Sequence, residues 1–256
     1  MRVVSYNVNG IRAAMNKGFC EWLKTEPADV ICLQETRTEK DSVDHGQFSD
    51  CGYWHYWFSA KRRAYSGVAV LTKIKPDRVE YGIGNAASDN EGRILQLDFG
   101  NVHLINAYFP SGSSGDVRQQ FKYNWLNEFY KFLHDVKKHY PNIILAGDYN
   151  IAHKEIDIYN PKGNKNTSGF LPAERTWMDK FFDSGWIDTF RRFHPEPHQY
   201  SWWSRRFPTV RSQNKGWRLD YINVTESLKY NLTDAKIFAD IKHSDHCPVY
   251  TDITLQ

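Results

Sequence analysis

Short strand-like segments separated by turn-forming residues dominate the chain. Apolar and β-branched residues concentrate in eight of them, at residues 2–8, 29–36, 66–72, 93–99, 102–109, 142–150, 218–224 and 248–253. Gly100-Asn101 forms a tight turn between two segments, which implies antiparallel pairing. Helical spacing of apolar residues is confined to residues 19–23, 121–136 and 177–182. We therefore expect mixed sheets with helices packed outside them, in an α/β (α+β) fold.

Length and composition favour one soluble domain that spans residues 1–256. No repeat or linker divides the 256 residues, and no apolar run approaches the ~20 residues of a membrane helix. The first residues lack the features of a signal peptide. The four cysteines are scattered without a Cys-x-x-Cys pair, as is typical of a reducing compartment. We expect a monomeric protein of bacterial type that resides in the cytoplasm, works at the nucleoid and has no membrane partner.

Positive charge and aromatic rings gather between residues 191 and 218. The net charge of the whole chain is only +3. Glu196 is the one acid in this stretch, whose basic residues are Arg191, Arg192, Arg205, Arg206, Arg211, Lys215 and Arg218. Cations attract phosphates and aromatic rings stack on bases, so the stretch is suited to a nucleic-acid surface. A solvated basic loop with its rings in the core would give the same composition.

Acidic and amide side chains follow or enter several of the apolar strands. They include Glu35 after one strand, Asp148 and Asn150 after another, Asp220 within a third, and Asp245 before the last. Carboxylates are costly to bury unless they are paired or bind a cation. Several at strand ends indicate one shared cleft, and oxygen ligands favour a hard cation, Mg²⁺ with Mn²⁺ as a substitute.

Two local arrangements sharpen this prediction. Strand periodicity puts Asp148 and Asn150 on the same side, where Asn7 from the end of the first strand can join them. The neighbouring residues Asp245 and His246 favour proton or phosphate chemistry. Together with the basic aromatic stretch, these residues indicate phosphodiester hydrolysis.

Six short motifs in one order resemble the exonuclease III family of AP endonucleases. They are residues 5–13 (SYNVNGIRA), 33–36 (LQET), 107–110 (AYFP), 146–150 (AGDYN), 217–221 (WRLDY) and 244–246 (SDH). The resemblance implies a four-layered α/β sandwich of two mixed β-sheets flanked by helices, as in the deoxyribonuclease I-like superfamily. It also implies a divalent-metal-dependent hydrolase that cleaves duplex DNA 5′ to abasic sites. Removal of blocked 3′ ends and 3′→5′ exonuclease activity would accompany that incision.

The resemblance also implies a role for each candidate residue of the active site. Glu35 would be the principal metal ligand, within a set that comprises Asn7, Glu35, Asp148, Asn150, Asp245 and His246. Asp148 would position or deprotonate the attacking water, and Asn150 would orient it. Asp220 would hold His246, which faces the phosphate together with Tyr108. A tyrosine hydroxyl, a histidine and a metal ion can stabilise charge that grows on phosphoryl oxygens.

The DNA-binding residues that the resemblance implies fall into two groups. Trp202, Trp217 and Leu219 match the apolar pocket for the flipped-out baseless sugar, although a large aromatic side chain can equally be core. The predicted phosphate contacts are Arg12, Arg37, Asn160, Lys162 and Asn164. Departures from the family pattern are Ser111, where many members have an amide, and Asn9, where some have an acid.

Two other functions are compatible with parts of this pattern. Phosphatases and phosphodiesterases of the same superfamily share the Glu, Asp-x-Asn and Ser-Asp-His skeleton. The context of Trp217–Tyr221 and the loop at residues 160–170 argue against them. A catalytically silent module that binds DNA damage would lack some catalytic residues, whereas every expected one is present here.

Overall fold

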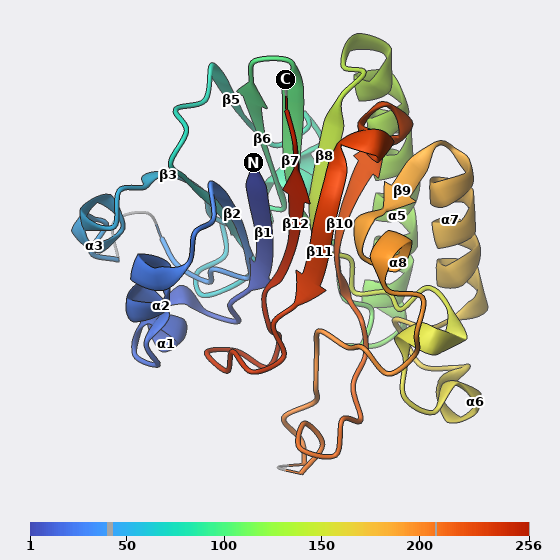
Figure 1. Cartoon of the computed structure of the whole chain (residues 1–256). Coiled ribbons are helices and arrows are strands. Elements are labelled where there is room, and N and C mark those ends of the chain that lie inside the picture. The colour runs from blue at the N-terminus through green and yellow to red at the C-terminus, as the bar shows by residue number, and fades with distance from the viewer. Residues whose placement is uncertain (40–42, 208, 256) are drawn as a thin grey trace.

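A computed structural model describes residues 1–39, 43–207 and 209–255, which form two six-stranded sheets (Figure 1). The first sheet has the order β11-β12-β1-β2-β4-β3, with β1 (Arg2–Asn7), β2 (Val30–Gln34), β3 (Trp54–Phe58), β4 (Val68–Thr72), β11 (Leu232–Ile237) and β12 (Val249–Ile253). The second has the order β5-β6-β7-β8-β10-β9, with β5 (Arg78–Tyr81), β6 (Ile94–Phe99), β7 (Val102–Tyr108), β8 (Ile143–Asp148), β9 (Trp186–Asp188) and β10 (Asp220–Thr225). Only β1 with β2 and β7 with β8 pair in parallel among these strands, so both sheets are mixed.

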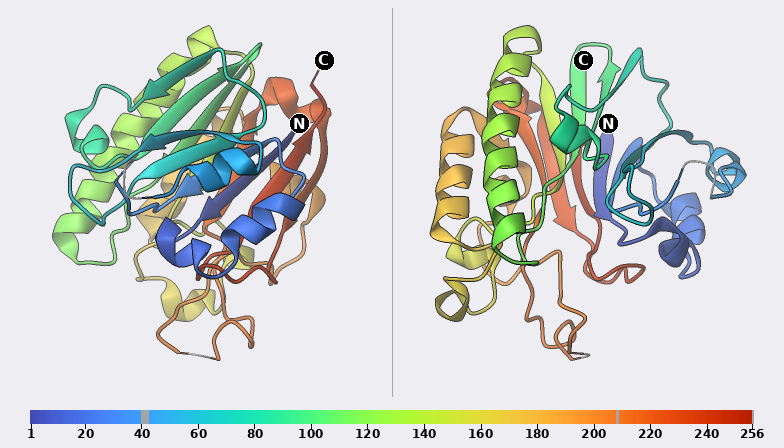
Figure 2. Two further views of the ribbon diagram at one scale, coloured as in Figure 1. Left: turned by 90° about the vertical axis from the view of Figure 1, so that its left-hand side faces the viewer. Right: turned by 180° about the vertical axis from the view of Figure 1, so that it is seen from behind.

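Helices cover the outer face of each sheet (Figure 2). α1 (Ile11–Met15), α2 (Phe19–Thr25) and α3 (Gly46–Asp50) flank the first sheet, while α5 (Asp116–His139) and α7 (Pro172–Asp183) flank the second. The shorter segments are α4 (Ala86–Asp89), η2 (Glu155–Asp157), α6 (Pro161–Asn164), α8 (Thr189–Phe193) and η3 (Glu226–Asn231). The described helices do not include one long and apolar enough to span a bilayer.

Three apolar clusters fill the three interfaces between these four layers. Val3 and Ile144 belong to the cluster between the sheets. Their neighbours Val4 and Ile143 belong instead to the two outer clusters, under the helices. This alternation follows from the two-residue period of a strand whose two faces are both buried. The predicted four-layered α/β sandwich is confirmed.

All eight predicted strands are present, and the turn at Gly100 joins β6 to β7 as an antiparallel hairpin. Sequence analysis missed β3, β5, β9 and β11, which are the four edge strands of the two sheets. Edge strands are paired on one side only and are partly exposed, as in β5, where no residue is buried. Their sequences therefore lack the continuous apolar run that reveals a central strand.

Candidate active site

The two sheets meet at the ends of β1 and β8, where polar side chains replace the apolar core. Asn7 and Asp148 are the last residues of these strands, and Asn7 Nδ2 donates a 2.8 Å hydrogen bond to Asp148 Oδ2. Asn150 N donates to the other carboxylate oxygen at 2.8 Å, which its left-handed backbone conformation (φ 52°) allows. Both carboxylate oxygens are thus held by donors, and Asp148 has one fixed orientation.

Asp220 lies opposite Asp148 in the antiparallel register of β10 and β8. Its Oδ2 contacts His246 Nδ1 at 2.8 Å, and His246 Nε2 lies 3.9 Å from Asp148 Oδ2. Ser201 Oγ donates to the same Asp220 oxygen at 2.6 Å. The imidazole is therefore held between two buried carboxylates, as predicted for the Asp220–His246 pair.

Burial and mutual charge shift the pKa values of these groups. Burial raises the pKa of Asp148 to about 7, with Asp220 adding to the rise and His246 opposing it. Burial alone would lower the pKa of His246, but Asp220 and Asp148 outweigh it and raise that pKa to about 10. The site thus combines a histidine cation with a carboxyl group that titrates near neutral pH.

Glu35 and Tyr108 form a second contact across the two sheets. The Tyr108 hydroxyl donates to Glu35 Oε1, and Arg37 Nη2 donates to Glu35 Oε2 at 2.6 Å. Burial and the neighbouring Glu35 raise the pKa of Tyr108 well above its usual value. The hydroxyl therefore stays protonated and remains a hydrogen-bond donor at neutral pH.

Asn9 connects the predicted ligands Asn7 and Asp245, a role that sequence analysis missed. Its backbone N–H donates to Asn7 Oδ1 at 2.9 Å, and its Nδ2 donates to Asp245 Oδ1 at 2.7 Å. Trp202 Nε1 donates to the other oxygen of Asp245 at 3.2 Å. An acid at position 9 would keep the backbone bond to Asn7, but its carboxylate could not donate to Asp245, so the amide is suited to this place.

A pocket of about 290 Å³ opens directly beside these groups. Its lining includes the polar residues Glu35, Asn150, Asp245 and His246, and also Gly169, Trp202, Trp217 and Leu219. The two indole rings meet edge to face, with centroids 6.0 Å apart at 88°. Both Trp side chains are only partly buried, so they line the pocket rather than complete the core. The structure thus brings the predicted apolar residues and the predicted catalytic residues to one cleft.

The donor set around this pocket fits a hard divalent cation. Ligand atoms of Asp148, Asp220 and His246 lie within 4.8 Å of one another. Asp220 Oδ1 is buried without a hydrogen-bond partner. Carboxylate and amide oxygens are the ligands that Mg²⁺ and Mn²⁺ prefer. Asp220 therefore joins the candidate ligands, although sequence analysis assigned it only to His246.

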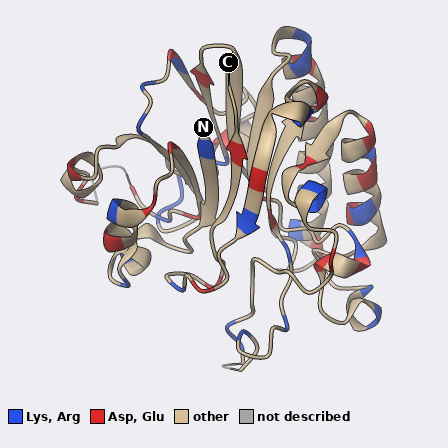
Figure 3. Cartoon of the chain, in the orientation of Figure 1, with Lys and Arg blue, Asp and Glu red and all other residues tan. Residues whose placement is uncertain are grey.

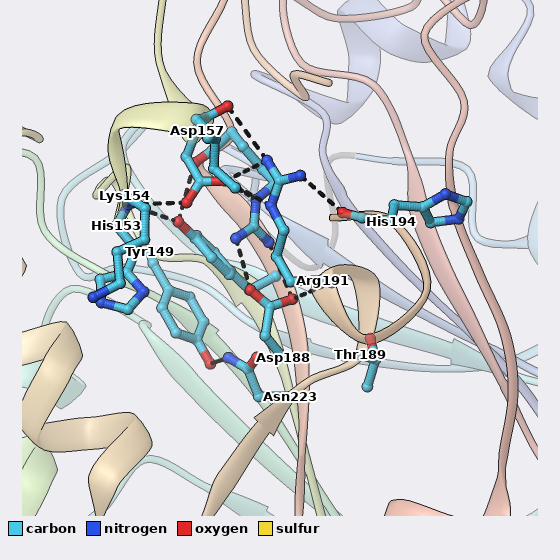
Figure 4. Close-up of polar contacts among 12 residues, drawn as sticks. Tyr149, His153, Lys154, Asp157, Asp188, Thr189, Arg191, His194 and Asn223 are labelled. Carbon is cyan, nitrogen blue, oxygen red and sulfur yellow. Dashed lines mark hydrogen bonds and ion pairs between the residues drawn. The ribbon is translucent and has the colours of Figure 1, made fainter. Parts of the chain in front are cut away.

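A buried ionic network lies next in sequence to the pocket residue Trp217, and Figure 4 shows Asp157, Asp188 and Arg191 of this network. Asp157 Oδ1 accepts from Arg191 Nη2 at 2.6 Å and from Arg218 Nε at 2.7 Å. Arg218 Nη2 also donates to Asp188 Oδ2 at 2.6 Å. The nucleic-acid interpretation of the basic stretch is therefore wrong for Arg191 and Arg218, because their guanidinium groups form ion pairs inside the protein. Arg218 directly follows Trp217, so the network holds the segment that carries this pocket residue in place.

The predicted phosphate contacts lie on several surface segments. Arg12 and Arg37 are exposed, and Arg37 also lines the pocket. Lys162 is exposed on α6, whereas Asn160 caps that helix and Asn164 Nδ2 donates to two backbone carbonyls. Figure 3 shows Lys and Arg on α6 and on the loop near residue 205, at one end of the molecule. The two asparagines thus shape their own loop.

Sequence analysis also missed Lys122 and Glu174, which form a fully buried ion pair next to the pocket. Lys122 shares the inward face of α5 with Leu126 and Phe129, and Glu174 shares that of α7 with Met178. A charged residue in the apolar stripe of a helix was the available signal, because such a charge must be paired.

The chain is similar to known nucleases along nearly its whole length. It is 43% identical over 251 residues to an exodeoxyribonuclease of Bacillus subtilis (strain 168), across 97% of this chain and 98% of the relative. It is 38% identical to the DNA repair nuclease APEX1 of Danio rerio, across 97% of this chain and 81% of the relative.

Solved structures agree with these matches. An AP endonuclease from Archaeoglobus fulgidus superimposes with a TM-score of 0.91 at 27% identity, over 100% of both chains. The 3′ phosphatase NExo from Neisseria, bound to a product DNA hairpin, gives a TM-score of 0.92 at 25% identity, also over 100% of both chains. A family model matches residues 4–246. The chain belongs to the Endonuclease/Exonuclease/phosphatase family.

Proposed function

We propose that the protein hydrolyses the phosphodiester bond 5′ to abasic sites in duplex DNA, and that it removes blocked 3′ ends and acts as a 3′→5′ exonuclease. The observation that carries the proposal is the position of Asp148 and His246 beside a pocket walled by Trp202 and Trp217. The names of its relatives, an exodeoxyribonuclease and a DNA repair nuclease, support DNA as the substrate. The 3′ phosphatase neighbour supports action at 3′ ends.

Asp148 is the proposed base for the attacking water. Bonds from Asn7 and Asn150 hold its carboxylate in one orientation. A pKa raised to about 7 lets this group accept a proton near neutral pH, which a typical aspartate does poorly. Asn150 also lines the pocket, where it would orient the same water.

His246 and Tyr108 are the proposed donors to the scissile phosphate. The histidine remains cationic at neutral pH because Asp220 and Asp148 stabilise its proton. Tyr108 keeps its hydroxyl hydrogen for the reasons given above. A fixed cation and a fixed hydroxyl stabilise negative charge that grows on phosphoryl oxygens.

A divalent metal ion completes the proposed site, with Mg²⁺ as the expected ion and Mn²⁺ as a substitute. Glu35 is the proposed principal ligand, and Asn7, Asp148, Asn150, Asp245 and Asp220 are the further candidates. His246, which the sequence also placed in this set, is a cation without a lone pair for the ion and is left to the phosphate. When bound, the ion supplies positive charge that stabilises the phosphoryl oxygens and the leaving group. The carboxylate of Glu35 already holds Tyr108 and Arg37 in place, so it organises donors as well as offering ligand oxygens.

The pocket explains the proposed preference for abasic sites. Its apolar wall, formed by Trp202, Trp217 and Leu219, suits a deoxyribose without its base. Extrusion of a nucleotide that has no pairing partner also costs least. The surrounding phosphates would contact Arg12, Arg37, Asn160 and Lys162, whereas Asn164 donates to backbone carbonyls and would act only by shaping this loop. We further propose that residues 1–256 act as one catalytic domain, as a monomer in the cytoplasm.

The test uses an end-labelled duplex with one abasic-site analogue and an intact duplex of the same sequence. We expect a single incision 5′ to the lesion with Mg²⁺, and none with EDTA. Lesion binding without incision would instead identify a silent DNA-binding module. Neither binding nor incision, together with hydrolysis of small phosphate esters, would identify a phosphatase of the same family.

A further inference from the structure

The buried ion pair of Lys122 and Glu174 joins helices α5 and α7 next to the pocket. Both side chains are fully buried, and Lys122 Nζ lies 2.5 Å from Glu174 Oε1. Replacing a buried ion pair by apolar residues is often neutral or stabilising, because both charges must be desolvated. A gain in folding stability therefore does not explain why this ion pair is present. The other hydrogen bonds of its two side chains indicate a positioning role instead.

Lys122 holds the catalytic turn. Its Nζ donates a 2.8 Å bond to the backbone carbonyl of Asn150, whose own N–H holds Asp148. Asn150 has a left-handed backbone conformation that few non-glycine residues adopt. An ammonium group bonded to its carbonyl therefore helps to fix this conformation.

Glu174 holds a second segment of the pocket lining, at Gly169. Its Oε2 accepts from Gly169 N at 2.7 Å and from Leu171 N at 3.0 Å. Gly169 lies so close to Trp217 that an added Cβ would be 3.1 Å from the indole ring and 3.1 Å from Asn150 O. The position of Gly169 therefore determines how much room remains beside Trp217.

A polar side chain on α5 strengthens this connection. Gln119 Nε2 donates to Glu174 Oε1 at 3.1 Å, and its Oε1 accepts from Ser168 Oγ at 2.7 Å. Ser168 lines the pocket beside Gly169. Glu174 thus accepts four hydrogen bonds on its two oxygens, which a carboxylate can do and an amide cannot.

We propose that the Lys122–Glu174 pair is a specificity-determining pair of positioning residues, which fixes Asn150 and the contact of Gly169 with Trp217 in the pocket lining and so favours a sugar without a base over a nucleotide that carries one. This inference rests on the proposed function. Neither side chain reaches the pocket itself. The pair acts through Asn150 on one side and through Gly169 on the other.

The test compares two rates for each variant under single-turnover conditions. One is incision of a duplex with an abasic-site analogue, and the other is release of an intact 3′ nucleotide from a recessed end. The variants are Glu174→Gln, Lys122→Met and the double substitution, with Lys131→Met as control, because Lys131 forms an exposed ion pair on the same helix. Both rates scale with the folded fraction of a variant, so their ratio can still be interpreted when a variant is partly unfolded.

We expect each single variant to lower the ratio of abasic incision to intact-nucleotide release by about fivefold or more, while Lys131→Met leaves it unchanged. The ratio for the double variant should fall no further than the ratio for the more affected single variant, because both substitutions break the same connection. Equal losses of both rates, or additive losses in the double variant, would overturn the inference. Absence of incision by the wild-type protein would contradict the proposed function instead.

Discussion

Asn7 and Asp148 stand 141 residues apart in the chain and share a buried hydrogen bond of 2.8 Å. Asn7 ends β1 in the first sheet and Asp148 ends β8 in the second, so the bond joins the two sheets. The Tyr108–Glu35 contact joins them again a short way along the same edge. The candidate active site is therefore a product of sheet packing, and neither sheet contains it alone.

Asp148→Asn should abolish incision and spare binding. The amide keeps the shape of the side chain but cannot take a proton from water, so the single-turnover rate should fall by about 100-fold or more. Affinity for the lesion, measured in EDTA by fluorescence anisotropy, should stay within about threefold of wild type, less than ~1 kcal/mol.

Thermal unfolding provides the control for this variant. Because burial raises the pKa of Asp148, its ionised form destabilises the folded state above the ordinary pKa of an aspartate. The variant should therefore unfold no earlier than wild type at pH 8 in EDTA. A rate within about tenfold of wild type, ~1.4 kcal/mol, would rule out Asp148 as the base.

Central strands and long helices were predictable because their burial imposes a pattern on the sequence. β8 is buried at every position, and its apolar run leads straight into Asp148. β5, at an edge, has only one residue that is even half-buried. A hydrophobic sequence pattern reflects burial, so a mostly exposed edge strand carries only a weak pattern.

Site residues were predictable where they belong to a motif and unpredictable where they depend on tertiary contacts. Trp217, Asp220 and His246 stand in recognisable motifs, and the structure brings them to one cleft. Ser201 and Glu174 act through partners that are 19 and 52 residues away. The charge of Arg218 suggested a DNA contact, but its position one residue after the pocket wall turns it inward. Charge alone does not reveal the partner that neutralises it.

Asp220→Asn should introduce a loss of activity between pH 6 and pH 8 that the wild type lacks. The wild-type His246, with a pKa of about 10, stays cationic from pH 6 to pH 9. Its raised pKa stabilises the folded state below about pH 6.5, and this stabilisation is lost as the pH rises through about 10. Without the Asp220 charge the histidine should lose its proton near neutral pH, so the variant's activity should fall between pH 6 and pH 8.

Two measurements check this expectation. An NMR titration of His246 in metal-free protein reports its pKa directly, and a pH–rate profile reports the effect on incision. Asp240→Asn is the matched control, because Asp240 is exposed and does not touch the imidazole. A parallel pH profile for wild type and Asp220→Asn would exclude the proposed role of Asp220.

Asp157→Asn should destabilise the fold in a pH-dependent way. Burial opposes ionisation, but Arg218 and Arg191 outweigh it and lower the pKa of Asp157 to about 2. A lowered pKa stabilises the folded state above the unfolded value of about 4, and this contribution disappears as the pH falls through about 2. The variant should lose about 2–3 kcal/mol at pH 7 and roughly half of that at pH 3, as measured by urea unfolding. Asp135→Asn, at an exposed ion pair, should change little at either pH, and an equal loss at both pH values would show that shape rather than charge matters at position 157.

Replacing Arg205 and Arg206 by alanine should weaken the salt dependence of DNA binding. Both side chains are exposed on the loop beyond the pocket, and Arg205 reaches to 3.4 Å from Asp245. Each phosphate contact that is lost should reduce the slope of log affinity against log salt by about one unit. Lys138→Ala is the control, because Lys138 lies just before the start of β8, at the end of the molecule opposite the pocket. If the slope were unchanged in the double variant, the pair would be a solvated surface, and the phosphates would be bound by Arg12, Arg37 and Lys162 instead.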